Sequence, residues 1–203
     1  MILLFRVDEV CHLVCHQACL DSFGEHAVHC RELTGFKYRH DLVRDVLFDI
    51  FSRAGISAKK EALVNFLTDP LEGRSTFRPA DILIFGCVGG KHACVDLTGV
   101  SPLIGLGGSA FTVGHAALKV ASGKVTKHEK ACLDNQHLFI TFDFDTFGFL
   151  APEAMDLLSR VQRVMHSNFM TPRSMDVVFK RISFAIQKQV AAQLVVHLPT
   201  ISM

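Results

Sequence analysis

Cysteine and histidine residues are concentrated near the start of the chain. Two pairs of potential ligands, separated by six residues, are formed by Cys15, Cys19, His26 and Cys30. Two such pairs can bind one tetrahedral Zn2+ ion, and a segment too short to form its own core can fold around the metal. The ligand set stays open, because Cys11 can replace Cys15 or Cys19, and His29 can replace His26. The alternative is that these are ordinary buried thiols and surface histidines.

Two aspartates stand near the ends of neighbouring apolar runs. Asp81 opens the first run, and Asp96 lies in the second, where side-chain alternation puts it on the same side as Thr98. A carboxylate among apolar residues is costly unless it is paired or binds a cation. Two converging carboxylates and a backbone carbonyl are suitable ligands for Mg2+, which can activate water and stabilise a phosphoryl transition state. A capping or salt-bridging pair is the alternative.

A third group of polar residues, Tyr38-Arg39-His40-Asp41, begins a predicted helix. Arg39 and His40 beside a helix N-terminus suit a phosphate, because the free N–H groups and the helix dipole favour an anion. The alternative is a solvated helix start with Asp41 in its first turn.

The elements that must position these residues follow from apolar periodicity. The helix that begins near Tyr38 has apolar residues at helical spacing, and Gly55 marks its end. Gly89 and Gly90 join two apolar runs, which is typical of a hairpin. The expected strands are 56–66, 82–88, 92–100 and 138–144, and the further helices are 111–132 and two that follow Pro152 and Pro172. The order of elements predicts an α/β or α+β fold.

Composition limits the class of protein. Of 203 residues, 49% are hydrophobic and 20% are charged, so the chain can bury a core and is not a disordered segment. The counts of Lys+Arg (21) and Asp+Glu (20) exclude a polybasic tail protein. No apolar run reaches the ~18–20 residues of a membrane-spanning helix. Seven cysteines, an odd number, favour metal binding over a disulfide framework. We expect a soluble, intracellular and nuclear protein without a membrane partner.

Four motifs occur in one order along the chain: Phe23-Gly-Glu-His-Ala-Val-His-Cys30, Tyr38-Arg-His-Asp41, Arg78-Pro-Ala-Asp-Ile-Leu83 and Ala93-Cys-Val-Asp-Leu-Thr-Gly-Val-Ser-Pro102. Over roughly residues 10–170, the series resembles the C-terminal end of reverse-transcriptase-type open reading frames of non-LTR retrotransposons. There, a CCHC zinc knuckle precedes a restriction-like endonuclease of the PD-(D/E)xK superfamily. The order helix, three strands, helix, strand is similar to that superfamily's core. The resemblance implies a zinc knuckle over 1–34, a restriction-endonuclease-like core over 35–150 and a C-terminal helical pair over 151–203.

The resemblance also implies roles for individual residues. The zinc-knuckle ligands are Cys15, Cys19, His26 and Cys30, with zinc as the structural metal. Asp81 and Asp96 resemble the carboxylates that hold the catalytic Mg2+, although Ala80 is inserted between Pro79 and Asp81. Arg39 and His40 stand where the family has a motif that faces DNA.

The main departure from the family pattern is Thr98, which occupies the usual lysine position. Similar retrotransposon nucleases have this lysine shifted to the next helix, where the lysines available here are Lys119, Lys124, Lys127 and Lys130. Lys124 and Lys127 are the catalytic candidates, and a solvated helix end is the alternative. Glu61 is a further candidate carboxylate, or part of an exposed charge run.

The function implied by the resemblance is metal-dependent nicking of DNA by a module derived from a non-LTR retroelement. The alternative is a catalytically inactive nucleic-acid-binding or structural remnant of that domain, which Thr98 and the near-neutral charge favour. The expected partners are DNA and a reverse-transcriptase segment outside this chain, so we expect a fragment or an isolated remnant of such a protein.

Overall fold

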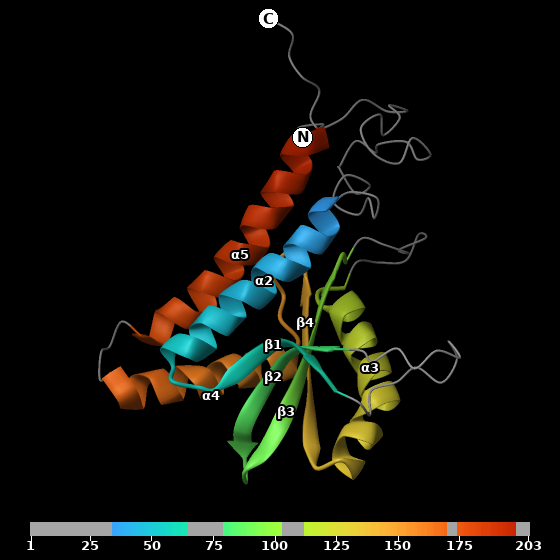
Figure 1. Cartoon of the computed structure of the whole chain (residues 1–203). Coiled ribbons are helices and arrows are strands. Elements are labelled where there is room, and N and C mark those ends of the chain that lie inside the picture. Colours follow the sequence, from blue (N-terminus) through green and yellow to red (C-terminus); the bar gives the residue numbers. More distant parts are fainter. Residues whose placement is uncertain (1–33, 65–78, 103–111, 170–173, 198–203) are drawn as a thin grey trace, which may run out of the picture.

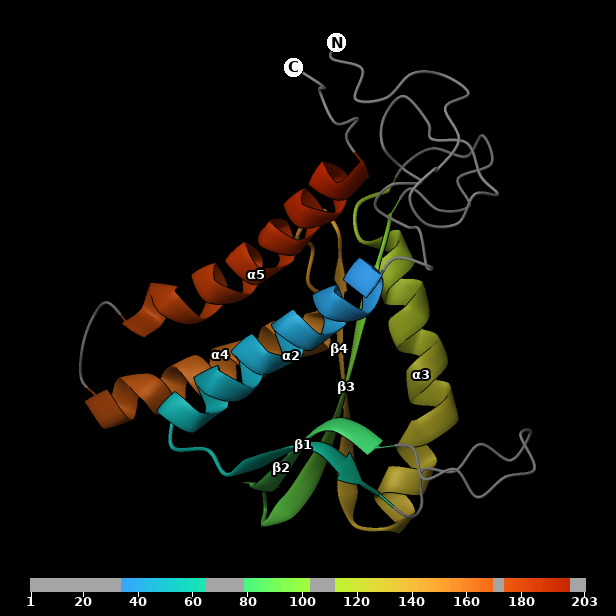
Figure 2. The ribbon, with the colours of Figure 1, turned by 45° about the horizontal axis from the view of Figure 1, so that its top comes forward.

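A four-stranded sheet lies between one helix and a group of three others (Figures 1 and 2). The computed structural model describes residues 34–64, 79–102, 112–169 and 174–197. Its elements, in chain order, are α2 (Thr34–Arg53), β1 (Ala58–Leu63), β2 (Pro79–Val88), β3 (Lys91–Val100), α3 (His115–Asp134), β4 (His137–Asp145), α4 (Pro152–Phe169) and α5 (Ser174–His197). This mixed α/β order confirms the predicted sequence of helix, three strands, helix, strand and two helices.

The sheet has the order β1-β2-β3-β4. Strand β2 is antiparallel to both of its neighbours, β1 and β3, whereas β4 runs parallel to β3. A parallel neighbour requires a long crossover connection, and α3 lies in that connection. Gly89 and Gly90 have φ values of 59° and 78°, as the turns that join tightly connected antiparallel strands require. The predicted hairpin is therefore confirmed.

The main core lies between the sheet and α2, α4 and α5 (Figure 2). The predicted apolar face of α2 is confirmed, since four of its residues and Ala54, directly after its end, are at most 1% exposed; the four are Val43, Leu47, Ile50 and Phe51. Phe142 and Phe144 of β4 are fully buried in the same core. Helices α4 and α5 contribute Leu158 and Ile182, also fully buried. The C-terminal helices thus share one core with the sheet.

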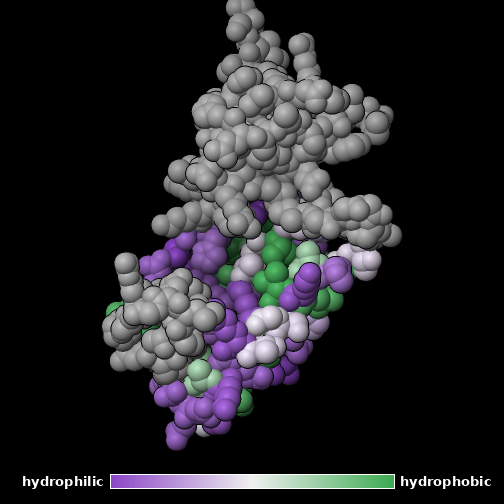
Figure 3. Space-filling model, turned by 90° about the vertical axis from the view of Figure 1, so that its right-hand side faces the viewer, coloured by the Kyte–Doolittle hydropathy of each residue, from purple (hydrophilic) through white to green (hydrophobic). Residues whose placement is uncertain are grey.

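Helix α3 covers the other face of the sheet (Figure 1). Ala117, Ala121 and Cys132 are buried on its inner side, and Cys132 belongs to a smaller cluster with Cys94 of β3. The side of the molecule on which α3 lies is largely hydrophilic where it is coloured, around a smaller hydrophobic area (Figure 3). No helix in the described ranges is both long and apolar enough to span a bilayer.

Several predicted boundaries differ from the structure: α2 begins at Thr34 and β2 at Pro79, each a few residues before the expected start. The first strand was expected from Ile56, but it begins at Ala58, because the Ile56 amide still donates a hydrogen bond to the Phe51 carbonyl of the helix end. Helix α3 begins at His115 and not near residue 111. Gly114 precedes it with a φ of 75°, a left-handed conformation that few other residues adopt.

Candidate active site

The strand register brings Asp81 and Asp96 together. Ile82 of β2 pairs with Val95 of the antiparallel strand β3, so Asp81 and Asp96 occupy the next opposed position. Side chains at opposed positions lie on one face, with Cβ atoms ~4.5–5.5 Å apart. The two carboxyl groups lie close enough for each to shift the pKa of the other. Asp81 is held further by the Leu97 amide, which donates to its Oδ2 at 2.6 Å.

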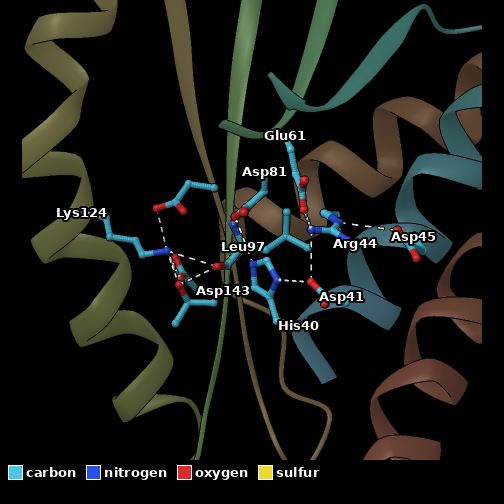
Figure 4. Close-up of polar contacts among 11 residues, drawn as sticks. His40, Asp41, Arg44, Asp45, Glu61, Asp81, Leu97, Lys124 and Asp143 are labelled. Carbon is cyan, nitrogen blue, oxygen red and sulfur yellow. Dashed lines mark hydrogen bonds and ion pairs between the residues drawn. The ribbon is translucent and has the colours of Figure 1, made fainter. Parts of the chain in front are cut away.

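Lys124 of α3 reaches this pair from one side of the sheet (Figure 4). Its Nζ lies 2.7 Å from Oδ2 of Asp96 and 3.7 Å from Oδ1 of Asp143 on β4. The ammonium also donates to the Thr98 hydroxyl and, at 3.5 Å, to the Leu97 carbonyl. Thr98 therefore contacts a lysine of α3, the helix that follows β3 in the chain.

The pKa values of the two aspartates are shifted in opposite directions. Burial raises the pKa of Asp81, but the hydrogen bond and charge of His40 outweigh burial and lower this pKa overall. Burial raises the pKa of Asp96, and the Asp81 carboxylate raises it further against the opposing charge of Lys124. Separated pKa values are expected where two carboxyl groups share one site and cannot both ionise freely.

His40 reaches Asp81 from α2 (Figure 4). Its Nε2 is 3.2 Å from Oδ2 of Asp81, and its Nδ1 is 3.4 Å from Oδ1 of Asp41. The hydrogen bond to Asp81 is the largest influence on the pKa of His40 and raises it, although burial acts in the opposite direction. The side chain is 29% exposed, so His40 lies at the edge of the site where solvent reaches it.

Glu61 is linked to this site through Arg44 and not by direct contact with the two aspartates. Arg44 Nη1 lies 2.5 Å from Oε1 of Glu61 and 3.1 Å from Oδ1 of Asp41. The Glu61 side chain is 63% exposed. Its φ of 48° is unusual for a strand residue, and Glu61 is skipped in the pairing of β1 with β2. Its contacts are those of a charge network on α2.

Two other predicted site residues are placed away from the aspartates. Arg39 is 1% exposed, and a Cβ at Gly99 would come within 3.3 Å of its Nε. Burial lowers the pKa of Arg39 to about 10. This interior position does not suit the surface contact with a phosphate that was predicted for Arg39. Lys127 is exposed on α3, whereas Lys124, one helical turn before it, faces the sheet.

Asp143 was not predicted as a site residue. It lies on β4 beside Thr98 of β3 in the parallel register, and its side chain is 0% exposed. The available signal was an aspartate between two phenylalanines in an alternating strand. A buried carboxylate is costly unless it is paired or binds a cation, and this argument for Asp96 as a site residue applies equally to Asp143.

The predicted zinc ligands, Cys15, Cys19, His26 and Cys30, lie outside the described residues. The described cysteines are free thiols: Cys87, Cys94 and Cys132. Over residues 34–64, 79–102, 112–169 and 174–197, no group of three or more His, Cys, Asp or Glu side chains is arranged to hold a metal ion.

The oxygen atoms at this site nevertheless fit a hard divalent cation. Asp81 and Asp96 lie at opposed positions of β2 and β3, and the carbonyl of Leu97 faces the same ammonium as Asp96. Carboxylate and carbonyl oxygens are the ligands that Mg2+ takes in proteins, usually with water completing the octahedron. Asp81, Asp96 and Leu97 are therefore the residues suited to hold it.

Comparison with protein-family models and with curated proteins found no match for this sequence.

Proposed function

We propose that this chain contains a restriction-like, metal-dependent DNA endonuclease domain that derives from a non-LTR retroelement and carries an N-terminal zinc knuckle. The observation that supports the proposal best is the convergence of Asp81, Asp96 and Lys124 from three different elements. Lys124 Nζ is 2.7 Å from Asp96 Oδ2, and the strand register places Asp96 opposite Asp81. Two carboxylates beside one ammonium are the groups that metal-assisted phosphodiester hydrolysis needs.

Each residue would have a distinct role. When bound, Mg2+ supplies Lewis acidity and lowers the pKa of a water molecule. Asp81 and Asp96 would hold the cation, and the Leu97 amide fixes the Asp81 carboxylate by its 2.6 Å hydrogen bond. Lys124 would orient the attacking water or stabilise charge on the scissile phosphate. Water then adds to phosphorus, the P–O bond to the leaving nucleotide breaks, and one strand is nicked.

Contacts to the DNA backbone would come from His40 and the zinc knuckle. His40 has a pKa raised above its ordinary value, so it carries more positive charge near neutral pH than a free histidine. Three exposed lysines add positive charge to α3: Lys119, Lys127 and Lys130. Phosphate contacts of this kind position DNA without reading its sequence.

A second candidate function is a nucleic-acid-binding domain that has lost the chemistry. The charges at the site neutralise one another with protein groups alone, since Lys124 pairs with Asp96 and His40 pairs with Asp81. A set of paired charges can serve as a structural network. This observation favours an inactive remnant, with Thr98 at the usual lysine position as further support.

Nicking of supercoiled plasmid by the full chain in Mg2+ tests the proposal. We expect Asp96→Asn and Asp81→Asn to lower the nicking rate about 100-fold or more. Asp156→Asn, at an exposed position of α4, is the matched control and should nick like wild type. Equal rates for wild type and Asp96→Asn would exclude the enzymatic function. DNA binding without nicking by the wild type would favour the second candidate.

A further inference from the structure

Asp143 is a buried carboxylate that the roles above do not use. Its side chain is 0% exposed, and neither carboxylate oxygen has a hydrogen-bond partner identified in the described part of the chain. Lys124 is the cation that lies nearest, with its Nζ 3.7 Å from Asp143 Oδ1. A buried carboxylate without a compensating cation is strongly unfavourable. The position of Asp143 is therefore tied to that of Lys124.

The register explains why Asp143 faces this lysine. Thr98 of β3 and Asp143 of β4 are partners in the parallel ladder, so their side chains lie on one face of the sheet. The same face is covered by α3 (Figure 4). Lys124, which donates to the Thr98 hydroxyl, thus lies over two adjacent strands. Its ammonium sits between Asp96 of one strand and Asp143 of the next.

Lys124 offsets part of the cost of burying the Asp143 charge. The pKa of Asp143 is raised to about 6, mainly by burial and to a smaller extent by the carboxylates of Asp96 and Glu153. The charge of Lys124 acts in the opposite direction and lowers this pKa, as does the neighbouring Thr141 hydroxyl.

Asp96 and Asp143, the two carboxylates near Lys124, differ in their access to solvent. Asp96 is 34% exposed and lies opposite Asp81 on the neighbouring strand, so its carboxylate is also a candidate metal ligand. Asp143 is fully buried, so we assign it no role as a metal ligand. When Asp96 is engaged by a cation, Asp143 remains as the fixed negative charge beneath the ammonium.

We propose that Asp143 is a positioning residue, a buried counter-ion that holds the Lys124 ammonium beside Asp96 and the Leu97 carbonyl. Any effect of Asp143 on catalysis rests on the proposed nuclease function. The pairing of Asp143 with Lys124 is a property of the protein without substrate and can be measured without nicking.

The first test is hydrogen exchange at the lysine ammonium, measured by 1H–15N NMR of the metal-free full chain. A held ammonium exchanges its protons slowly, and Lys124→Arg identifies its signal by removing it. We expect Asp143→Asn to accelerate exchange at Lys124 about tenfold or more, the equivalent of losing one charge-assisted contact. An unchanged exchange rate would overturn the proposal.

Asp145→Asn is the matched control. Asp145 lies on the same strand and is 1% exposed, but its Oδ1 accepts hydrogen bonds from the amides of Phe147 and Phe149. The control makes the same substitution at equal burial, away from Lys124. The proposal is supported if the Lys124 ammonium exchanges its protons slowly in Asp145→Asn and fast in Asp143→Asn. Equal acceleration in both variants would assign the effect to general loosening and overturn the proposal.

Plasmid nicking supplies the catalytic readout. Asp143→Asn should lower kcat about tenfold and leave KM for DNA unchanged, because Asp143 is too deeply buried to contact the substrate. A rise in KM alone would overturn the proposal. If the wild type does not nick, the nuclease function fails, while ammonium exchange still decides whether Asp143 holds Lys124.

A double-mutant cycle covers the case in which Asp143→Asn folds poorly. Thermal unfolding of Asp143→Asn, Lys124→Met and the double variant measures the coupling of the two side chains. We expect the double variant to lose less stability than the sum of the two single losses. Additive losses would show that the two groups do not interact and would overturn the proposal.

Discussion

His40 Nε2 lies 3.2 Å from Asp81 Oδ2, which joins α2 to the first residues of β2. The contact shifts both groups toward their charged forms, because it raises the pKa of His40 and lowers that of Asp81. A helix on one face of the sheet is thereby held to the strand that carries half of the candidate metal site.

The His40 contact predicts a pH-dependent stability. The pKa of His40 is raised in the folded state, so its stabilisation is fully present below the unfolded pKa of ~6.5 and is lost as pH rises through the folded value. The metal-free wild type should therefore exceed His40→Gln in unfolding free energy by more at pH 6 than at pH 9. Urea denaturation at both pH values measures this. His115→Gln, at an exposed position, is the control, and a gap that does not change with pH would contradict the prediction.

Gly99 and Gly123 should respond oppositely to alanine. A Cβ at Gly99 of β3 would lie 2.8 Å from a ring carbon of Phe144, which is fully buried. Gly99→Ala should therefore lose about 1–3 kcal/mol through overpacking. Gly123 lies in α3, where an added Cβ would meet no atom of the described residues within 4 Å, so Gly123→Ala should gain about 0.5–1 kcal/mol. Chemical denaturation of both variants is the measurement, and a shared sign would refute the contrast.

Asp49 should contribute modestly to stability, and only above acidic pH. Hydrogen bonds from Arg53 and then Arg181 of α5 lower its pKa, with distances of 2.7 and 2.5 Å to Oδ2. A lowered pKa gives stability that is present above ~3.8 and is lost as pH falls through the folded value. Because Asp49 is 40% exposed, Asp49→Asn should cost less than about 1 kcal/mol at pH 7.

Urea unfolding at pH 7 and pH 3 checks the Asp49 prediction. The difference between wild type and Asp49→Asn should shrink toward zero at the lower pH. Asp156→Asn, exposed on α4, should show no such convergence. A difference for Asp49→Asn that grows on acidification would disprove the assignment.

Zinc content tests the predicted N-terminal ligands. The full chain purified without added metal should hold about one zinc ion, since four thiolate or imidazole ligands make one tetrahedral site. Cys19→Ser should reduce the zinc bound per chain, measured by elemental analysis, because it removes a predicted ligand. Cys87→Ser is the matched control at a half-buried thiol of β2. Equal zinc in the two variants would remove the knuckle from the proposal.

Local patterns predicted the parts of the fold that depend on neighbouring residues. The apolar face of α2 follows from helical periodicity, and Phe51 and Leu47 are buried as expected. The hairpin that carries Asp81 and Asp96 could be predicted from Gly89 and Gly90, but not which residues oppose each other. The turn pairs Val88 with Lys91, and this register alone would place Asp81 opposite Thr98. A register shift between Ile84 and Val88 places Asp81 opposite Asp96 instead.

Contacts between distant segments could not be predicted in the same way. The sequence offered several lysines on α3, and only the docking of that helix on the sheet selects Lys124. The place of Asp143 depends on the parallel pairing of β4 with β3, which no turn specifies. Arg39 was expected at the surface from its place near a helix start, but Gly99 leaves room on β3 for its long side chain to lie inward.

The acids and the bases of the site come from different segments, and this has a consequence for dissecting the protein. The two acids, Asp81 and Asp96, lie on the hairpin of β2 and β3. The cations that pair with them, His40 and Lys124, lie on α2 and α3. An excised hairpin would keep the mutual repulsion and lose its compensation. Splitting the polypeptide between β3 and α3 should therefore leave Asp96 without Lys124 in the first half, and only complementation by the second half should restore the ion pair.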